Sequence, residues 1–451
     1  MLRAHRSSHE RQLASESATA AHGSVANVQD MGLVLIHGFI IFFMQAGFIM
    51  VEAGHGRAKN IINTCLKNVV DILLSCLAWW AVGFAFAYGS SSNAFIGTSE
   101  FFHAGEAETQ KPWFFSWMFA LCCVTIVSGC MTERTQLLAY PVLTLLVTLL
   151  IHPVAVHWVW SDGGWLRSVH AGIYFLDFAG CTLVHMIGGV VGLVGAVCVG
   201  PRMGRFEECG SVKELRGHDM SSISMGTLML WFGWFGFNVG SCYLYENPNM
   251  QVLNRVALNM TLTASSAGCI ALLLGHWLGK GTFDLRVCCN GLLSGLVVST
   301  GLAGFCTPWA SCVGGVLAGL LYTLTTRLLL RLHVDDPMDN AAVHLGGGAL
   351  GTVLVGFLAR PAYVEQLTGS LGSGVVYGSP LAGTQLGIQL LGLLVICLWA
   401  AVPALVVFKG LARCGLLRVD QAAELAGIDT FDHGGPGFPE FVGPAANRPS
   451  V

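Results

Sequence analysis

Charged residues are scarce in this chain. Asp, Glu, Lys and Arg make up only 11% of its 451 residues, whereas 54% are hydrophobic and the mean hydropathy is +0.64. A soluble globular protein carries roughly 25% charged residues. This shortage excludes a string of soluble domains and predicts an all-α polytopic membrane protein. The net charge of −3 points to no particular partner, and no nucleic-acid-binding motif is present.

Metal-binding and catalytic patterns are also missing. The 16 cysteines form no C-x-x-C pair and no Cys/His cluster with metal-ligand spacing. Most of them lie in apolar segments, where cysteine behaves as a small hydrophobic residue; disulfides or a bound metal are the less favoured alternatives. No nucleophile–base pair or phosphate loop is visible. We therefore predict no metal and no cofactor, and a membrane enzyme is the least favoured function.

Eleven apolar segments are long enough to cross a bilayer as helices of about 20 residues. We predict spans at 31–53, 65–88, 113–131, 136–158, 174–199, 222–243, 252–279, 286–304, 311–331, 341–360 and 381–408. They make residues 31–412 one transmembrane domain. Residues 1–30 form a polar N-terminal extension without the apolar core of a signal peptide; a disordered extension and an organelle-targeting tail remain open. Residues 413–451 form a polar tail.

Basic residues set the predicted orientation. With the N-terminus outside, the outer loops hold only Lys111, Arg167, Arg255 and Arg360. The inner loops and C-terminal flank then hold Arg57, Lys59, Lys67, Arg134, Arg202, Arg205, Lys213, Arg216, Lys280, Arg286, Arg327, Arg331, Lys409, Arg413 and Arg418. We therefore predict an N-out/C-in protein with a cytosolic tail, although three arginines in the N-terminal extension run against the rule.

One pattern, D-x7-H-x2-G-G-x2-G, occurs twice. It begins at Asp177, with His185 and Gly188, Gly189 and Gly192, and again at Asp336, with His344 and Gly347, Gly348 and Gly351. The copies fall on the fifth and tenth spans, and a repeat of five helices inverts the second unit. The predicted architecture is therefore a 5+5 inverted repeat plus one helix, with both histidines meeting where the halves join.

Each of these residues has a structural and a functional interpretation. A single intramembrane histidine is more often a structural hydrogen-bonding group, but a repeated pair favours function, such as holding a small molecule or passing a proton. Asp177 and Asp336 precede each histidine by two helical turns, which suits helix N-capping. For Asp177 the alternative is electrostatic stabilisation of a cation that enters from outside.

Aromatic residues are dense near the predicted outer side. An interfacial aromatic belt is the ordinary explanation, and a cation–π vestibule is the alternative for some of them. The residues are Trp113, Phe114, Phe115, Trp117, Phe119, Trp158, Trp160, Trp231, Trp234, Phe235 and Phe237.

Several runs together resemble the ammonium transporter family (Amt/Mep/Rh), and its Amt branch more than the Rhesus glycoproteins. They are MQAGFIMVEAG (44–54), SGCMTERTQ (128–136), DFAGCTLVHMIGGVVGLVGA (177–196), WFGWFGFNVGS (231–241), VDDPMDNAAVHLGGGALGT (334–352) and GIDTFDHG (427–434). The resemblance covers about residues 30–435. Cys181, Met186, Ile187 and Leu345 depart from the family pattern, and we expect no consequence for the pore.

The resemblance implies a multi-pass plasma-membrane homotrimer in the lipid bilayer, with one hydrophobic pore per subunit and an ammonium/ammonia substrate. His185 and His344 match the pore histidines, and Phe119 and Phe237 match the gate. Phe115, Phe119, Trp160 and Ser241 match an outer NH4+ recruitment site, with Asp177 and Asp336 in support. The tail would contact a neighbouring subunit, and a PII-type regulator is a further candidate partner.

Recruited NH4+ would then be deprotonated, and NH3 would cross the pore with net proton co-transfer. Two other functions stay open. A Rhesus-type neutral channel should lack the outer Trp–Ser site, and an ammonium sensor would be favoured by a large kinase or cyclase domain, whereas this chain ends about 40 residues after the last predicted span.

Overall fold

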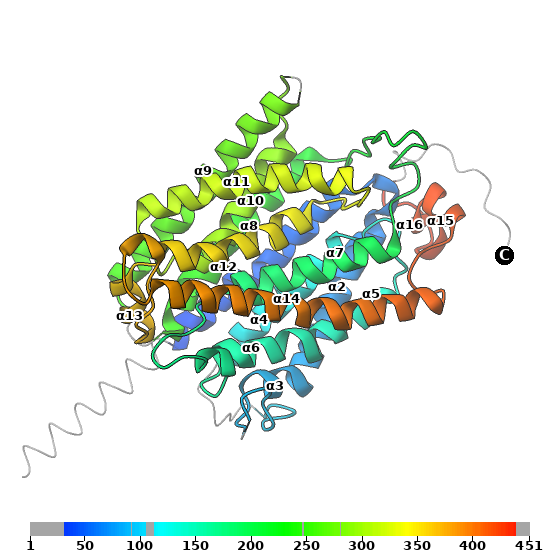
Figure 1. The fold of residues 1–451 in the computed structure, drawn as a ribbon. Coiled ribbons are helices and arrows are strands. Elements are labelled where there is room, and N and C mark those ends of the chain that lie inside the picture. Colours follow the sequence, from blue (N-terminus) through cyan, green and yellow to red (C-terminus); the bar gives the residue numbers. More distant parts are fainter. Residues whose placement is uncertain (1–30, 92, 105–111, 246–247, 280, 439–451) are drawn as a thin grey trace, which may run out of the picture.

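The computed structural model describes residues 31–438 except 92, 105–111, 246–247 and 280. Within these ranges the secondary structure is helical, with three isolated β-bridges and no β-strand. Most of the helices run side by side along a common direction, and the 32-residue α14 (Ala382–Arg413) extends along the length of the bundle (Figure 1). The residues 1–30 predicted as a polar extension lie outside the described part of the chain.

The first half of the bundle begins with the helix Met31–His55. It continues through η1 (Ala58–Asn60), α2 (Ile61–Ala78), η2 (Trp79–Gly83), α3 (Phe84–Tyr88), α4 (Trp113–Gly129), α5 (Ala139–Leu146), η3 (Val147–Ile151), α6 (His152–Trp160), η4 (Trp165–Arg167), η5 (Cys181–Met186) and α7 (Ile187–Val199). Four of these elements, from η1 to α3, form one continuous helical stretch, Ala58–Tyr88.

The second half begins with α8 (Met220–Ser241). It continues through η6 (Cys242–Leu244), α9 (Met250–Leu278), α10 (Leu285–Leu302), α11 (Pro308–Arg331), η7 (Ala341–Gly346), α12 (Gly347–Leu358), α13 (Pro361–Thr368), η8 (Val375–Tyr377), α14, α15 (Gln421–Ala426) and α16 (Ile428–Asp432). Side-chain caps begin three of these helices, because Asp219, Asn249 and Asp284 each accept hydrogen bonds from first-turn backbone N–H groups of α8, α9 and α10.

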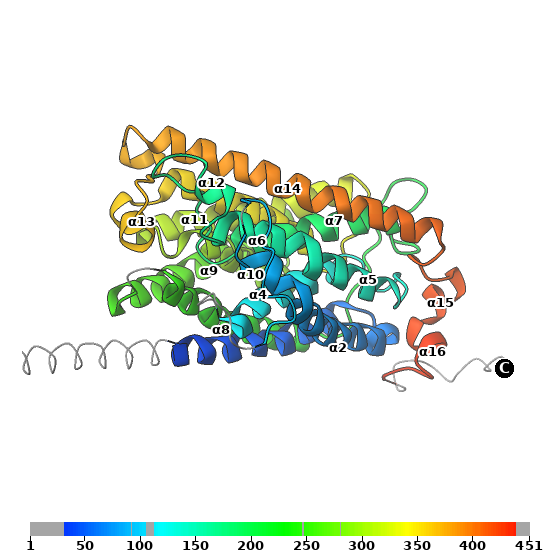
Figure 2. The same ribbon diagram turned by 90° about the horizontal axis from the view of Figure 1, so that it is seen from below.

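The all-helical membrane fold predicted from composition is confirmed. In the described part of the chain, nine helices are long and apolar enough to cross a membrane, and α4 is a shorter apolar helix. Each of the eleven predicted segments contains helix, although the fifth, 174–199, becomes helical only at Cys181; the number that cross the bilayer and the N-out/C-in orientation stay predictions. The helix Met31–His55 starts at one end of the bundle, and α15 and α16 lie at the other, which we call the tail end (Figure 2).

Lys67 was assigned to an inner loop, but the structure places it in a helix. Lys67 is inside α2, fully buried, and its ammonium pairs with the Glu52 carboxylate. The predicted span 65–88 already contained Lys67, so its assignment to a loop was wrong. That span also began too late, because the polar residues at the start of α2, which are buried against the bundle, lower its hydropathy.

The two halves meet through reciprocal glycine contacts. A Cβ atom on Gly189 would lie 2.3 Å from the Leu345 nitrogen, and one on Gly348 would lie 2.8 Å from the Met186 nitrogen. Each glycine thus packs against the residue that follows the other half's histidine. A two-fold relation between the halves gives this pattern, and glycine permits the close backbone approach.

The described part of the tail packs on its own chain. The Asp429 carboxylate accepts hydrogen bonds of 2.9 Å from the backbone nitrogens of Ile62 and Asn63, at the start of α2. The Ile428 nitrogen donates to the Asn60 side chain over 2.9 Å. The contact predicted with a neighbouring subunit stays a prediction, whereas α16 is held by the first turns of the second span.

Candidate functional site

A vestibule opens at the end of the bundle opposite the tail. Its cavity volume is about 100 Å³. Five residues expected in the recruitment site or its support line it together: Phe115, Phe119, Trp160, Asp177 and Ser241. They come from α4, α6, the segment before η5, and α8, so helices far apart in sequence build one aromatic chamber.

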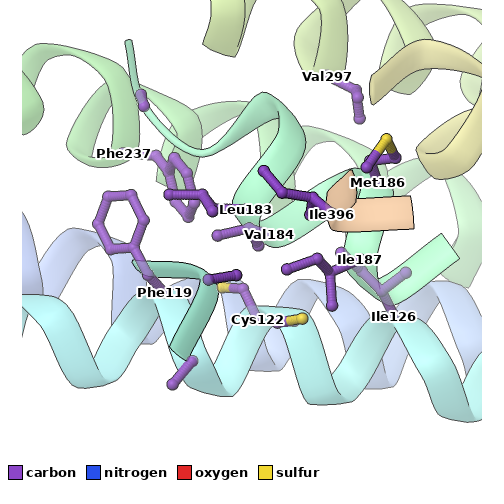
Figure 3. Packing of buried hydrophobic residues seen from close by; sticks show 14 of the residues in the cluster. Phe119, Cys122, Ile126, Leu183, Val184, Met186, Ile187, Phe237, Val297 and Ile396 are labelled. Atoms are coloured by element: carbon purple, nitrogen blue, oxygen red, sulfur yellow. The ribbon is translucent and has the colours of Figure 1, made fainter. Parts of the chain in front are cut away.

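The floor of the vestibule is a pair of stacked phenylalanines. Phe119 from α4 and Phe237 from α8 have ring centroids 4.1 Å apart at an angle of 32°, and their rings lie side by side in Figure 3. Phe119 lines the vestibule and Phe237 does not. Both are almost wholly buried, so the pair separates the vestibule from the interior.

The two motif histidines meet beneath this pair. The rings of His185 and His344 stack at a centroid distance of 5.3 Å and an angle of 17°. His185 lies in η5 and His344 in η7, and both elements are π-helical turns that precede regular helices. A π turn shifts the side-chain register by one residue and is frequent at functional sites. Here the same local distortion positions both rings.

The Nδ1 atoms of the two histidines are 3.2 Å apart. A hydrogen bond at this distance needs one protonated and one unprotonated Nδ1, so two neutral rings in different tautomers satisfy it. The Nε2 atom of His185 is buried and has no hydrogen-bond partner. That nitrogen is therefore available to a small polar molecule in the interior.

Trp234 is a site residue whose role the sequence left unassigned. Its ring stacks on His185 with a centroid distance of 5.3 Å and an angle of 21°, and it is completely buried. The aromatic run WFGWF places Trp234 one helical turn before Phe237 on α8, so both face His185. That spacing was a usable signal, but an interfacial belt explained the same residue equally well.

Two recruitment residues also make structural hydrogen bonds. The Ser241 hydroxyl donates to the Phe237 carbonyl over 2.8 Å, which leaves its oxygen lone pairs free to accept. The Trp160 indole nitrogen donates to the Asp177 carbonyl over 3.0 Å, and its ring meets Phe119 edge-on at 5.6 Å. Trp160 also lines the vestibule, so its ring is within reach of a cation held there.

Asp177 and Asp336 precede the N-cap residues Gly180 and Asn340, and both carboxylates accept backbone N–H groups at the start of the following π-helical turn. The Asp177 carboxylate accepts backbone N–H groups of Gly180, Cys181, Thr182 and Leu183 at 2.7–3.0 Å. Asp336 accepts the Ala341 nitrogen at 2.7 Å. Burial raises the pKa of Asp336 to about 6, with the nearby Asp339 carboxylate contributing. The four donors on Asp177 fix the turn that carries His185.

The residues that depart from the family pattern pack between helices. The Cys181 thiol donates to the Gly348 carbonyl over 3.3 Å, and Met186 and Leu345 lie against Gly348 and Gly189. These side chains therefore fill the interface between the two halves.

A family model described as the Ammonium Transporter Family matches residues 32–438. The chain is 36% identical over 425 residues to "Ammonium transporter 3" of Dictyostelium discoideum, covering 94% of this chain and 97% of that protein. It is also 36% identical to "Ammonium transporter Amt2" of Archaeoglobus fulgidus, covering 92% of this chain and 89% of the relative. The similarity to both relatives extends over nearly the whole chain.

Two solved structures show the same fold. "Sensor Amt Protein" matches with a TM-score of 0.83 and 31% identity, over 91% of this chain and 99% of that chain. Mep2 of Candida albicans matches with a TM-score of 0.77 and 24% identity, over 87% of this chain and 86% of that one. At its lower identity, the Mep2 match supports the fold alone.

Proposed function

Because the chain belongs to the ammonium transporter family, we propose that it transports ammonium along the row of rings that leads from the vestibule to the histidine pair. NH4+ is recruited by Phe115, Phe119, Trp160 and Ser241 and loses a proton near the gate. NH3 then crosses the hydrophobic pore past His185 and His344, with net transfer of the proton. The protein is a transporter and not an enzyme.

The observation that carries the proposal is the unbroken succession of rings. Phe119 stacks on Phe237 at 4.1 Å, Phe237 lies 5.6 Å from His185, and His185 lies 5.3 Å from His344. Only the first of these four rings lines the vestibule. A molecule that leaves the vestibule along this row therefore meets the gate first and the imidazoles next.

The vestibule chemistry suits NH4+ better than K+. The two ions have equal charge and similar size, so a bare negative charge would not separate them. Aromatic faces attract either cation, but only an ion with N–H groups can donate a hydrogen bond to the Ser241 oxygen. Asp177 supports this site indirectly, because its carboxylate oxygens are occupied by backbone donors.

The interior favours a neutral molecule. Moving an unpaired ion into a dry apolar space costs many kcal/mol, whereas a small polar molecule loses only its hydrogen bonds. Deprotonation to NH3 removes the larger penalty, and the free His185 Nε2 restores a hydrogen bond on the far side of the gate. The released proton can follow by way of the histidine pair, because its two Nδ1 atoms share one proton.

The test is an ammonium pulse on a solid-supported membrane that carries the purified protein. We expect a transient current in the wild type, no response to K+, and loss of the current in the His185→Ala/His344→Ala double variant. His170→Ala is the matched control, because this histidine is exposed and outside the described site; it should keep the current.

Each negative result identifies a different function. No wild-type current combined with an ammonia flux detected by a pH change would mean a neutral channel of the Rhesus type. Neither signal would favour the sensor hypothesis. A full current in the double variant would show that charge crosses by a route other than the histidine pair.

The last part of the proposal concerns the oligomeric state of the protein and the membrane in which it lies. We propose a homotrimer in the plasma membrane, since large apolar side chains remain exposed along α9, α11 and α14, where lipid or another subunit would cover them. Binding of a PII-type regulator stays a prediction that no contact in the described part of the chain addresses.

A further inference from the structure

The second span buries its polar side rather than its apolar side. On α2, Thr64, Lys67, Asn68, Asp71 and Ser75 are all buried. They recur every three or four residues and therefore share one helix face. Leucines of the opposite face, Leu66, Leu73 and Leu77, are exposed. Ionisable side chains inside a span are costly and mark functional sites by default, and these lie outside the ammonium path.

Two of the ionisable groups near this face satisfy one another. The Lys67 ammonium donates to the Glu52 carboxylate, and to the Ser128 hydroxyl over 2.6 Å. The Asn68 side chain adds a donor to Glu52 over 2.9 Å, and Ser128 adds another over 3.3 Å. Glu52 therefore has a matched charge and several donors, as a buried ion pair requires.

Asp71 has no such compensation. Its Oδ1 accepts one neutral hydrogen bond, from the Thr144 hydroxyl, and its Oδ2 is buried without a partner. The Tyr140 hydroxyl is likewise buried and unpartnered. Both residues line the same small cavity of about 10 Å³, between α2, α4, α5 and η3. A cavity of that size is at the lower limit for one water molecule.

We propose that Asp71 is an intramembrane proton-binding site, occupied as a carboxylic acid whose Oδ2–H donates to one internal water shared with the Tyr140 hydroxyl. The water satisfies both unpartnered groups at once. The proton removes a charge that a single neutral donor could not stabilise in an apolar interior.

The surrounding charges support a proton rather than a metal or ammonium ion. With Glu52, Lys67 and Asp71 all ionised, the cluster would carry one excess negative charge. A second cation in the cavity would lie close to the Lys67 ammonium, which sits 5.5 Å from the centre of the Tyr140 ring. The other cavity walls are valine and leucine, with the Ser128 and Thr144 hydroxyls.

Among the described residues, the neighbouring elements bring no further compensating charge to Asp71. The helix Met31–His55 contributes Glu52, α5 contributes Tyr140, and α4 contributes Ser128. Arg134, beyond α4, directs its guanidinium to the backbone carbonyls of Gly200, Cys130, Thr132 and Asp335. A proton is thus the simplest way to neutralise Asp71 where it lies.

The test is infrared spectroscopy of the full-length protein in lipid bilayers at neutral pH. We expect Asp71→Asn to lose one protonated-carboxyl C=O band, with no loss of carboxylate absorption. Tyr140→Phe should keep that band and shift its frequency, because the shared water loses a partner. Asp432→Asn, an exposed aspartate on α16, is the control and should lose carboxylate absorption instead.

Loss of carboxylate absorption in Asp71→Asn would overturn the proposal. A band that changes when NH4+ or Rb+ is added would overturn it as well, by showing a cation in the cavity. If Asp71→Asn does not fold, Thr144→Val provides the second measurement, because it removes the donor to Oδ1 and should shift the same acid band. If neither Thr144→Val nor Tyr140→Phe shifts the frequency of the acid band, a protonated Asp71 is contradicted.

Discussion

Arg167 is the positively charged side chain among the described residues that line the vestibule. Its guanidinium lies 5.9 Å from the centre of the Tyr174 ring and 3.4 Å from the Asp162 carboxylate. The Asp162 side chain is 81% exposed, so water and salt weaken its neutralising effect. A cation at this mouth should lower the local concentration of NH4+ rather than raise it.

Arg167→Gln should therefore lower the KM for ammonium by roughly twofold at low ionic strength, with little change in maximal current. The difference should vanish as salt is added, because exposed charges are then screened. Current amplitudes over a series of ammonium concentrations, at two ionic strengths, measure both quantities. Arg360→Gln is the matched control, since Arg360 packs on Tyr363 outside the vestibule; an equal effect there would mean that only net charge matters.

Also at the scale of residues, the sequence predicted which residues form the site better than it predicted what surrounds each of them. The repeated motif indicated His185 and His344 because its two copies have identical spacing, and the structure brings the two rings together. The environment of Asp71 was not predictable, because the unpartnered oxygen depends on where α4 and α5 pack. Asp177 was left open between a cap and a charge, and in the structure its carboxylate accepts four backbone N–H groups.

At the scale of elements, the sequence predicted where the helices form but not where they are locally distorted. The apolar segments gave all the long helices, because length and hydropathy suffice for that. The π turns η5 and η7 leave no signal in hydropathy, since one inserted residue changes the register without changing composition. The start of the second span was placed late for a related reason: its buried polar face resembles a loop when side-chain direction is unknown.

The reciprocal glycine contacts between η5–α7 and η7–α12 make an element-scale prediction. In Gly189→Ala the new Cβ would lie 2.3 Å from the Leu345 nitrogen, and backbone cannot yield as a flexible side chain does. We expect a loss of roughly 1–3 kcal/mol in stability, as for other overpacked interiors. The ammonium current should fall as well, because the two histidine-bearing turns are forced apart.

Thermal unfolding in detergent and the current assay measure the two effects on Gly189→Ala. Gly387→Ala is the matched control, since a Cβ there would have open space around it on α14. It should unfold at or slightly above the wild-type temperature, because alanine favours the helix. Equal destabilisation by both substitutions would mean that helix propensity, rather than contact between the halves, sets the result.

At the scale of the whole molecule, a buried charge cluster joins the two halves at the tail end. Arg202 pairs with Glu133 and, over 2.8 Å, with Asp335, and Arg57 pairs with Glu133 over 3.0 Å. Glu133 follows α4 in the first half, and Asp335 precedes η7 in the second. Glu133 also has a left-handed backbone, with φ +72°, which these partners offset.

We expect this cluster to set the acid limit of stability. Burial alone would raise the pKa of Glu133, but Arg202 and Arg57 outweigh it and lower the pKa from 4.5 to about 2. The folded state therefore binds fewer protons than the unfolded state in this range. The stabilisation, on the order of 3 kcal/mol, is fully present above pH 4.5 and is lost as the pH falls through about 2. The pKa of Asp335 is shifted in the same direction, with Arg202 outweighing its burial.

Thermal unfolding midpoints of the detergent-solubilised protein should fall steeply over that window, and Glu133→Gln should change the curve in two ways. The variant should be less stable at neutral pH, because Arg202 and Arg57 lose a buried partner. Its midpoint should also fall less steeply in acid, with the remaining slope due to Asp335. Glu214→Gln, which removes a largely exposed partner of Arg216, should follow the wild type throughout. An unchanged acid slope in Glu133→Gln would mean that groups elsewhere take up the protons that unfold the molecule. The two halves of the protein would then be held together at the tail end by packing rather than by this charge cluster.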